Sequence, residues 1–242
     1  MSIKIENVEV MGWEHAIRGM RNPKNSWEKS DTYIAEGHDA HSNFKYLDEI
    51  EGATTNWMTL GHNDHQLMMS LAAGGPVHAK YRRMITVYLD ITAPLYWWKE
   101  FDTYKVGTVA NSCSTMHKIH AKEFTLEDFS CEHLMESRDY AMAYSSDEPY
   151  IYDFCNVMKD TIDALNFARR QFLETKDKRY WWQMIQLLPS SYNQKRTVML
   201  NYEVLVGMYE SRKNHKLDEW REFCKWIEGL PYSELITGGK AE

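Results

Sequence analysis

A β-branched and aromatic run leads directly into a tryptophan-rich segment, and this pair of elements constrains the fold more than any other feature of the chain. Residues 84–91, MITVYLDI, have the composition of a strand that is buried on at least one face. Thr92 is typical of a helix N-cap, and Pro94 then falls in the first turn. The apolar residues of this predicted helix are Leu95, Trp97, Trp98 and Phe101. The sequence therefore predicts a strand that continues into an aromatic helix.

Weaker periodic signals precede this strand. Apolar and polar residues alternate over positions 3–10, which predicts an edge strand with one buried face. The helical spacing of Trp13, Ile17 and Met20 predicts that a helix follows it. Residues 22–41 are polar and poorly periodic, so we expect a long loop there that can cover a site.

Another helix is bounded by signals at both of its ends. Asn63 is its expected N-cap, and apolar residues recur from Leu67 to Ala72. Gly74, Gly75 and Pro76 then end the helix. This glycine pair lacks the Lys and Ser/Thr of a phosphate-binding loop, so helix termination explains it.

Helical signals dominate the second half of the chain. Ser146 is the expected cap of a long helix whose apolar stripe runs from Ile151 to Phe172. The later predicted helices cover residues 180–187, 197–211 and 217–227, and the last of them is ended by Gly229 and Pro231. With strands early and helices late, we predict an α+β fold in which a small sheet packs with a mainly helical second half.

Composition bounds the class of protein. The 242 residues, of which 43% are hydrophobic, suit one domain over residues 1–242 with a buried core. No apolar run reaches the length of a membrane span, and residues 1–6 lack the layout of a secretion signal, so we expect a cytoplasmic protein. The four cysteines are scattered and are expected to be reduced thiols. A net charge of −7 disfavours nucleic-acid binding but leaves room for a small anion in a local basic pocket.

Three His-x-x-His pairs have the spacing of two metal ligands on a helix face. They are His38/His41, His62/His65 and His117/His120. None carries the Glu of His-Glu-x-x-His, so we expect solvated or structurally bonded histidines and no metal site.

Small and hydroxyl-bearing residues cluster in residues 101–117, between the aromatic helix and a further predicted helix. Such a loop lets backbone N–H groups and hydroxyls approach a ligand closely. The alternative is a Ser/Thr-rich turn that caps a helix at Met116, and residue type alone favours this alternative.

In its order of elements, the same segment resembles the flavin-dependent thymidylate synthases, whose signature is Arg-His-Arg-x-x-Ser-x-Asn-x-x-Ser-x-Arg-Tyr. Residues 103–105 fall on Arg-His-Arg and Thr108 on the first Ser. After a one-residue insertion, Asn111 falls on the Asn, Ser114 on the second Ser, and residues 116–117 on Arg-Tyr.

Further landmarks of the resemblance lie on both sides of this segment, across roughly the last two thirds of the chain. Upstream, residues 77–78 resemble the family's Gly-His, and Arg83 stands where a Glu is usual. The downstream positions that follow the family pattern are Leu188, Pro189, Asn201, Leu205, Arg212, His215 and Trp220.

The resemblance implies a homotetramer that binds FAD and deoxyuridine monophosphate at subunit interfaces. NADPH would reduce the flavin, and methylenetetrahydrofolate would supply the carbon. By the same resemblance, Ser114 and Arg212 face the nucleotide, and Ser114 is the catalytic candidate. The residues that would face the flavin are His78, Lys105, Asn111 and Asn201.

Each of these roles has a plainer alternative. Ser114 can be a helix cap, and Arg212 can be a solvated charge near the negative end of its helix. Trp97 and Trp98 could stack on a flavin or a base, but aromatic residues at helical spacing are more often core.

Several cationic positions of the family are changed, which leaves two functions open. The family's arginines are replaced by Thr103, Met116, Ile185 and Glu203. The first function is reductive one-carbon transfer to C5 of a deoxyuridine monophosphate-type nucleotide. The alternative is a non-catalytic nucleotide-binding or assembly protein that has lost flavin binding. Convergence of cations on one cleft would favour the enzyme, and the cations in question are Lys80, Arg83, Lys105, Arg196 and Arg212.

Overall fold

The computed structural model describes residues 3–34, 42–45, 58–136 and 153–239. The chain divides into two compact units. The sheet unit comprises residues 3–91, 100–111 and 196–242, and the helical unit comprises residues 1–2, 92–99 and 112–195. The expectation of a single domain over residues 1–242 stays a prediction.

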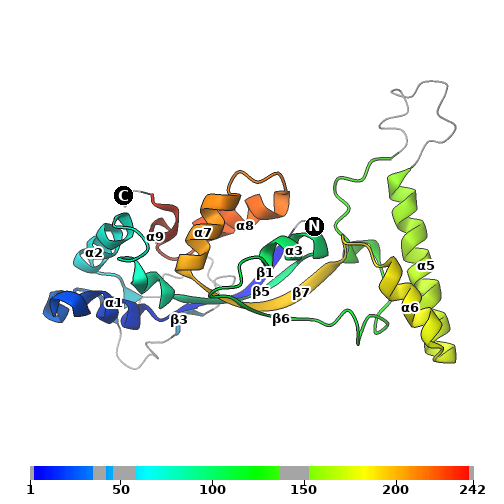
Figure 1. The fold of residues 1–242 in the computed structure, drawn as a ribbon, viewed down its shortest axis with the longest axis horizontal. Coiled ribbons are helices and arrows are strands. Elements are labelled where there is room, and N and C mark those ends of the chain that lie inside the picture. The colour runs from blue at the N-terminus through cyan, green and yellow to red at the C-terminus, as the bar shows by residue number, and fades with distance from the viewer. Residues whose placement is uncertain (1–2, 35–41, 46–57, 137–152, 240–242) are drawn as a thin grey trace, which may run out of the picture. The chain divides into compact units, whose positions relative to one another are not determined.

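A five-stranded sheet with the order β3-β1-β5-β7-β6 is the framework of the sheet unit (Figure 1). Its strands are β1 (Lys4–Met11), β3 (Ser42–Lys45), β5 (Thr86–Pro94), β6 (Val109–Ser112) and β7 (Asn193–Asn201). β1 pairs antiparallel with β3, with Glu9 opposite Lys45 and Val10 opposite Phe44. β1 therefore lies between β3 and β5, and the prediction that it is an edge strand was wrong.

The predicted strand-to-helix pair is confirmed, with a shifted boundary. β5 continues through Thr92 to Pro94, and α3 spans Leu95–Phe101. The strand is longer because its two-residue alternation of buried side chains continues through Ile91 and Ala93. Thr92 is consequently a strand residue and not an N-cap. Trp97 and Trp98 are buried, as expected of core residues.

The start of the helix predicted at residues 197–211 was wrong. Residues 193–201 form β7, in which Val198 and Leu200 are buried at alternate positions. α7 then spans Tyr202–Arg212, and the side chain of Asn201 caps it by accepting a hydrogen bond from Val204 N. The next predicted helix is confirmed as α8 (Asp218–Glu228), which ends at Gly229, and α9 (Glu234–Thr237) follows.

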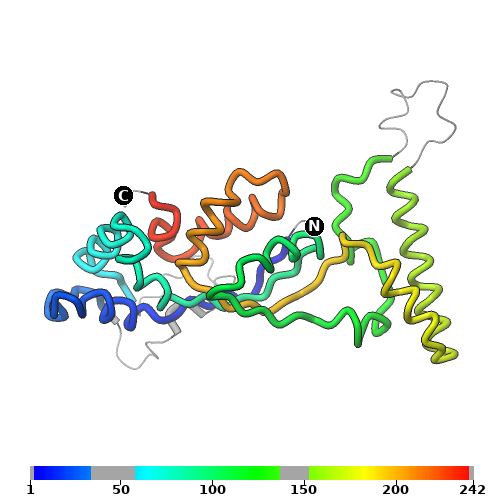
Figure 2. The backbone as a smooth tube through the Cα atoms, viewed as in Figure 1, coloured from blue at the N-terminus to red at the C-terminus, as the bar shows by residue number. Residues whose placement is uncertain are grey.

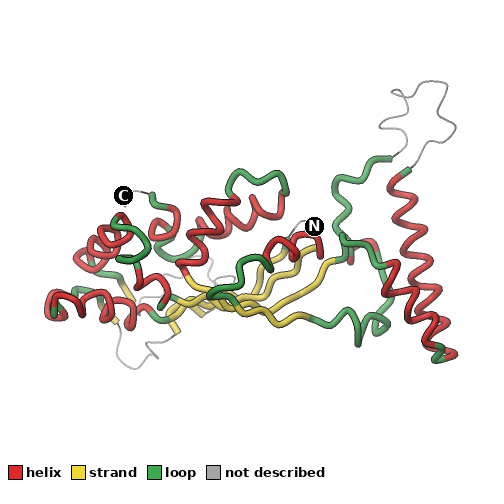
Figure 3. The backbone as a smooth tube through the Cα atoms, in the orientation of Figure 1, coloured by secondary structure: helices red, strands yellow, loops and turns green. Residues whose placement is uncertain are grey.

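Helices lie over one face of the sheet (Figure 3). Buried aromatic side chains pack between these helices. α1 (Trp13–Arg21) contributes Trp13, whose ring meets Tyr202 edge to face at 5.5 Å between centroids. Under α8, Trp220 stacks on Phe101 at 6.5 Å. All four rings are almost fully buried, so apolar contact joins α1 to α7 and α8 to the end of α3.

Two adjacent helices, α5 (Phe154–Thr175) and α6 (Lys178–Leu187), dominate the helical unit (Figure 2). Asp153 caps α5 through a hydrogen bond from Asn156 N, whereas Ser146 and Ile151 lie outside the described residues. The buried Asn166 side chain binds both the N–H and the carbonyl of Phe124. This pair of bonds joins α5 to a segment that contains the short 3₁₀ turn η5 (Leu126–Asp128).

Residues 22–34 form two 3₁₀ turns and a short strand, where the sequence predicts a loop. The turns are η1 (Asn22–Lys24) and η2 (Trp27–Lys29), and β2 (Tyr33–Ile34) pairs with β4 (Met58–Thr59). Residues 35–41, which include His38 and His41, lie outside the described residues.

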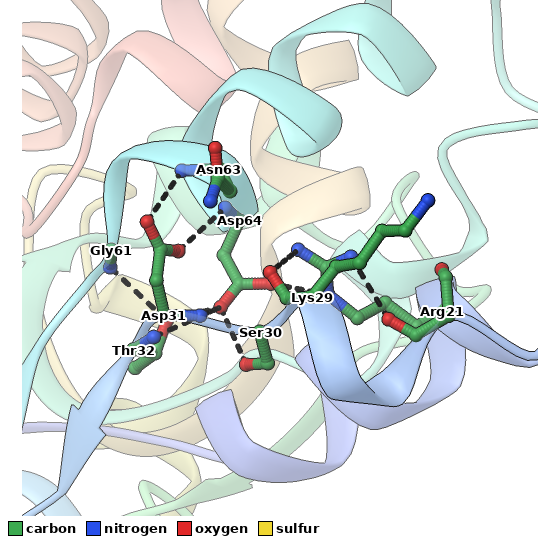
Figure 4. Close-up of polar contacts among 9 residues, drawn as sticks. Arg21, Lys29, Ser30, Asp31, Thr32, Gly61, Asn63 and Asp64 are labelled. Carbon is green, nitrogen blue, oxygen red and sulfur yellow. Dashed lines mark hydrogen bonds and ion pairs between the residues drawn. The ribbon is translucent and has the colours of Figure 1, made fainter.

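The buried carboxylate of Asp64, near the start of α2 (His62–Ala73), organises this segment (Figure 4). It accepts from Arg21 Nε at 2.6 Å, Ser30 Oγ at 2.7 Å and Thr32 Oγ1 at 2.6 Å. Burial raises the pKa of Asp64, but the hydrogen bonds from Thr32, Ser30 and Arg21 outweigh it and hold this pKa below the ordinary value of 3.8.

The start of α2 differs from the predicted cap. Gly61 is the N-cap, and Asn63 N donates instead to the carboxylate of Asp31, at 2.9 Å (Figure 4). Asp64 N donates to the same carboxylate at 3.1 Å, so a residue from a distant segment satisfies the first turn. The predicted end is confirmed, because α2 stops at Ala73 with Gly74 as its C-cap.

Asp64→Asn should lower the free energy of unfolding by about 3–5 kcal/mol, because it leaves the buried Arg21 guanidinium without its counter-charge. Urea denaturation measures the change. Asp160→Asn, at an exposed position of α5, is the control and should change stability by less than about 0.5 kcal/mol. Equal stability of the two variants would contradict the assigned role of Asp64.

The same carboxylate should make stability depend on acidic pH. Because the folded-state pKa of Asp64 is depressed, its contribution is complete above the ordinary value of 3.8 and is lost as pH falls through the lower folded-state value. Unfolding free energies measured across this range should therefore fall more steeply in the wild type than in Asp64→Asn. Parallel curves would show that Asp64 is not the responsible group.

Candidate binding cavity

A cavity of about 510 Å³ lies within the sheet unit, where the segment after α3 meets the start of α7. It contains two of the predicted flavin-facing residues, Lys105 and Asn201. The full lining is Arg83, Thr103, Tyr104, Lys105, Val106, Gly107, Asn201, Glu203, Val204 and Gly207. We call it the Lys105 cavity.

Gly107 allows the two walls of the Lys105 cavity to approach each other. Its φ of +81° lies in the left-handed region that favours glycine. A Cβ at this position would lie 3.0 Å from Val204 Cγ2 and 3.2 Å from Asn201 Nδ2. The hydroxyl of Thr108 donates to the carbonyl of Tyr104, which closes the segment upon itself. The glycine and this turn thus place Lys105 beside the N-terminus of α7.

Both signs of charge line the Lys105 cavity. Arg83 and Lys105 are exposed cations. Glu203 is their acidic neighbour, and its carboxylate lies 3.7 Å from the mostly buried Arg82. Arg82 and Arg83 are neighbours in the short 3₁₀ helix η4 (Lys80–Arg83). This one helix therefore supplies both the cation that lines the cavity, Arg83, and the cation that faces Glu203, Arg82.

Tyr81 fixes the position of η4. Its hydroxyl donates to the carbonyl of Met68 on α2, at 2.9 Å. Burial raises the pKa of Tyr81 to about 12, despite the opposing effect of Arg82, so the hydroxyl remains protonated and able to donate near neutral pH.

Arg212 lies behind the cavity wall and not in its lining. Its Nη1 donates to Glu100 Oε2 at 2.6 Å, and its Nε donates to the hydroxyl of Tyr104 at 2.9 Å. The guanidinium also lies 4.8 Å from the centre of the Trp220 ring. Glu100 Oε2 further accepts from Trp220 Nε1 at 3.1 Å, and His215 Nε2 lies 3.4 Å from it. The charge of Arg212 is thus balanced by a carboxylate.

His78 lines a different and larger cavity of the sheet unit, of about 1170 Å³. This cavity lies among α1, the segment after α1, α2 and η4, and Lys80 lines it as well. Lys24 and Lys29 add two more cations, and Glu28 supplies an acidic group. Arg21, held by Asp64, forms part of the wall.

The remaining predicted residues are placed elsewhere. Asn111 is an exposed residue of β6 and is in the lining of neither cavity. Ser114 belongs to the helical unit, where its Oγ accepts from His117 N at 2.9 Å. This contact closes a turn over residues 115–117, and no helix begins at Met116, so the helix-cap alternative for Ser114 was wrong. Its contact with a nucleotide stays a prediction.

The five cations whose convergence would favour the enzyme do not share one cavity. Arg83 and Lys105 share one cavity, and Lys80 lines the other. Arg196 pairs with Asp102 at 2.7 Å, and Arg212 pairs with Glu100. Sequence reasoning missed Glu100, Tyr104 and Gly107 as parts of the site, although Tyr104 falls on the His of the family's Arg-His-Arg.

Metal and membrane sites gain no support from the described part of the chain. In residues 3–34, 42–45, 58–136 and 153–239, no three His, Cys, Asp or Glu side chains group as metal ligands. His65 instead contacts Glu234 at 2.7 Å. Among the same residues, no helix is both long and apolar enough to span a membrane. The four cysteines are free thiols.

No model of a known protein family matches the chain, and neither does any curated protein. Solved structures do match. One is thymidylate synthase X (ThyX) from Helicobacter pylori with FAD and dUMP, at a TM-score of 0.61 and 16% identity over 98% of both chains. The chain has the fold of ThyX. A second structure, flavin-dependent ThyX from Helicobacter pylori complexed with FAD and dUMP, gives a TM-score of 0.60 at 16% identity, over 98% of this chain and 99% of that one.

The ThyX-like, α+β fold class predicted from the sequence is therefore confirmed. At 16% identity, the likeness to ThyX concerns the fold.

Gly107→Ala should destabilise the protein more than Gly75→Ala. Both glycines have a positive φ, so each alanine carries a backbone cost of about 1–2 kcal/mol. A methyl group at Gly75 meets nothing within 4 Å, whereas at Gly107 it presses on Val204 and Asn201. Urea denaturation of the two variants measures the difference, and equal losses would show that the close approach at Gly107 is not required.

Proposed function

We propose that this protein is a flavin-dependent, ThyX-like enzyme that transfers a one-carbon unit reductively to C5 of a deoxyuridine monophosphate-type nucleotide. FAD is the proposed cofactor, with NADPH and methylenetetrahydrofolate as co-substrates. We further propose that the enzyme is cytoplasmic and works as a homotetramer. The support is the ThyX fold, whose matching structures contain FAD and dUMP, together with the chemistry of the Lys105 cavity.

The observation that carries this proposal is the meeting of Arg83, Lys105 and Asn201 in one cavity. Two exposed cations and an amide suit the phosphate groups of a flavin nucleotide, because charge-assisted hydrogen bonds to phosphate are strong. The cavity volume lies in the range of small-molecule sites. The residues present therefore fit the phosphate-bearing part of FAD.

Bound FAD would supply the hydride chemistry of the reaction. In this proposal, Lys105 and Arg83 bind its phosphates, Asn201 orients it, and Asn111 and His78 are further candidate contacts. Ser114 is the proposed nucleotide contact and catalytic candidate. Because the protein contributes placement and charge, these residues act by holding the nucleotide and the flavin in the orientation that the reaction requires.

A second candidate function is favoured by a specific observation. Arg196 and Arg212 are each paired with a carboxylate, which reduces the positive charge offered to a doubly phosphorylated ligand. A non-catalytic protein that binds a nucleotide, or that acts in assembly, would tolerate this loss.

The visible absorption spectrum after incubation with FAD and desalting separates the two functions. The enzyme should retain flavin bands and then form a thymidylate-type product from deoxyuridine monophosphate, methylenetetrahydrofolate and NADPH. A colourless protein that still binds deoxyuridine monophosphate would support the non-catalytic function. Product formation should fall in Ser114→Ala if Ser114 contacts the nucleotide.

Lys105→Ala and Arg83→Ala should each weaken FAD binding about tenfold or more, because each removes a charge-assisted contact worth about 1.5–3 kcal/mol. Fluorescence titration of FAD measures the affinity. Lys225→Ala, which removes an exposed lysine of α8, is the matched control and should bind FAD like the wild type. If all three variants bound FAD equally, the Lys105 cavity would not be the flavin site.

A further inference from the structure

Tyr104 stands between the Lys105 cavity and the paired Arg212. The residue lines the cavity, and its hydroxyl oxygen accepts from Arg212 Nε at 2.9 Å. A guanidinium has only donors, so the phenol proton cannot be directed at Arg212. Within the part of the chain that the structure describes, no protein group accepts this proton. Tyr104 therefore has a donor available for a partner outside the protein.

Arg212 is itself held in place on three sides. Glu100 binds its Nη1, Tyr104 binds its Nε, and the Trp220 ring lies 4.8 Å from its guanidinium carbon. Glu100 is fixed in turn by the hydrogen bond from Trp220 Nε1. Turning Arg212 toward a ligand would break the Glu100 contact and leave a partly buried carboxylate without its cation, which is costly.

We infer that Tyr104 is a ligand-binding residue that donates its hydroxyl proton to a phosphate oxygen of the nucleotide in the Lys105 cavity, and that Arg212 is a positioning residue that acts through Tyr104. The phosphate is the expected acceptor because Arg83 and Lys105 line the same cavity. The nature of the whole ligand rests on the proposed function, but the role of Tyr104 requires only a phosphate group.

The series of contacts from Glu100 to Arg212 to Tyr104 explains how Arg212, whose charge is balanced by Glu100, can still contribute to binding. The Tyr104 oxygen accepts its hydrogen bond from Arg212. This contact fixes the orientation of the hydroxyl, so that its O–H bond points away from Arg212. Glu100 keeps the guanidinium in that position. In this arrangement the charge of Arg212 does not reach the ligand, and Arg212 instead orients the neutral hydroxyl of Tyr104 as the donor.

Tyr104→Phe tests this inference, because it removes the hydroxyl and keeps the ring. Calorimetric titration with inorganic pyrophosphate and, separately, with FAD should show about tenfold weaker binding of both, as expected for a hydrogen bond to a charged group. The matched control is Tyr209→Phe in α7, whose hydroxyl donates to Glu228 away from the cavity lining. This control should bind both probes like the wild type.

A double-mutant cycle tests the positioning role of Arg212. If Arg212 acts through Tyr104, adding Arg212→Gln to Tyr104→Phe should cause no further loss of pyrophosphate affinity. Glu100→Gln should weaken binding in the wild type and have no effect in Tyr104→Phe. Additive losses would show that Arg212 contacts the ligand directly and would overturn this role.

The two probes separate this inference from the proposed function. Pyrophosphate binding that depends on Tyr104, without any FAD binding, would uphold the inference and overturn the flavin proposal. FAD binding that is unchanged in Tyr104→Phe would overturn the inference and leave the flavin proposal standing. Absence of binding for both probes in the wild type would overturn both.

Discussion

One buried carboxylate holds together three segments of the sheet unit that lie outside the sheet itself. Asp64 binds Arg21 at the end of α1 and two hydroxyls of the segment after η2, so three parts of the chain meet at its two oxygens. The net effect of these contacts is a depressed pKa, which means that they favour the ionised form more than burial disfavours it. The larger cavity, which His78 lines, has Arg21 and Lys29 in its wall, so the shape of that cavity depends on this carboxylate.

Exposed and paired cations are separated at the Lys105 cavity. Arg83 and Lys105 line the cavity and are exposed, whereas Arg82, Arg196 and Arg212 lie outside its lining and each face a carboxylate. A carboxylate beside an arginine lowers the local positive potential but fixes the arginine's direction. In the function proposed above, affinity for phosphate comes from two cations, Arg83 and Lys105, and from donors of fixed orientation. This is a different solution from a cleft lined with many arginines.

Local signals predicted most of the elements, and their failures have physical causes. The strand before Leu95 and the end of α2 were predicted because composition and glycine act locally. The last residues of β7 were read as the start of a helix because they run directly into the helical residues of α7, although the buried Val198 and Leu200 alternate as in a strand. Asp31 could not be predicted as the acceptor for the first turn of α2, because it is contributed by a separate segment.

The site itself was predictable only in part. Lys105 and Asn201 came from the family resemblance and do share a cavity. The partners of Arg212 could not be predicted, because Tyr104 and Glu100 lie more than a hundred residues away along the chain. Pairing over such a separation leaves no trace in spacing or composition.

The division of the chain into units has a consequence for how the protein can be taken apart. β5 and β7 each begin in one unit and end in the other, and residues 112–195 are an insertion between two portions of the sheet unit. Neither unit is a continuous stretch that truncation at one terminus could isolate. Any attempt to obtain the sheet unit alone must replace residues 112–195 with a linker from Asn111 to Arg196, and residues 92–99 with a second linker from Ile91 to Glu100.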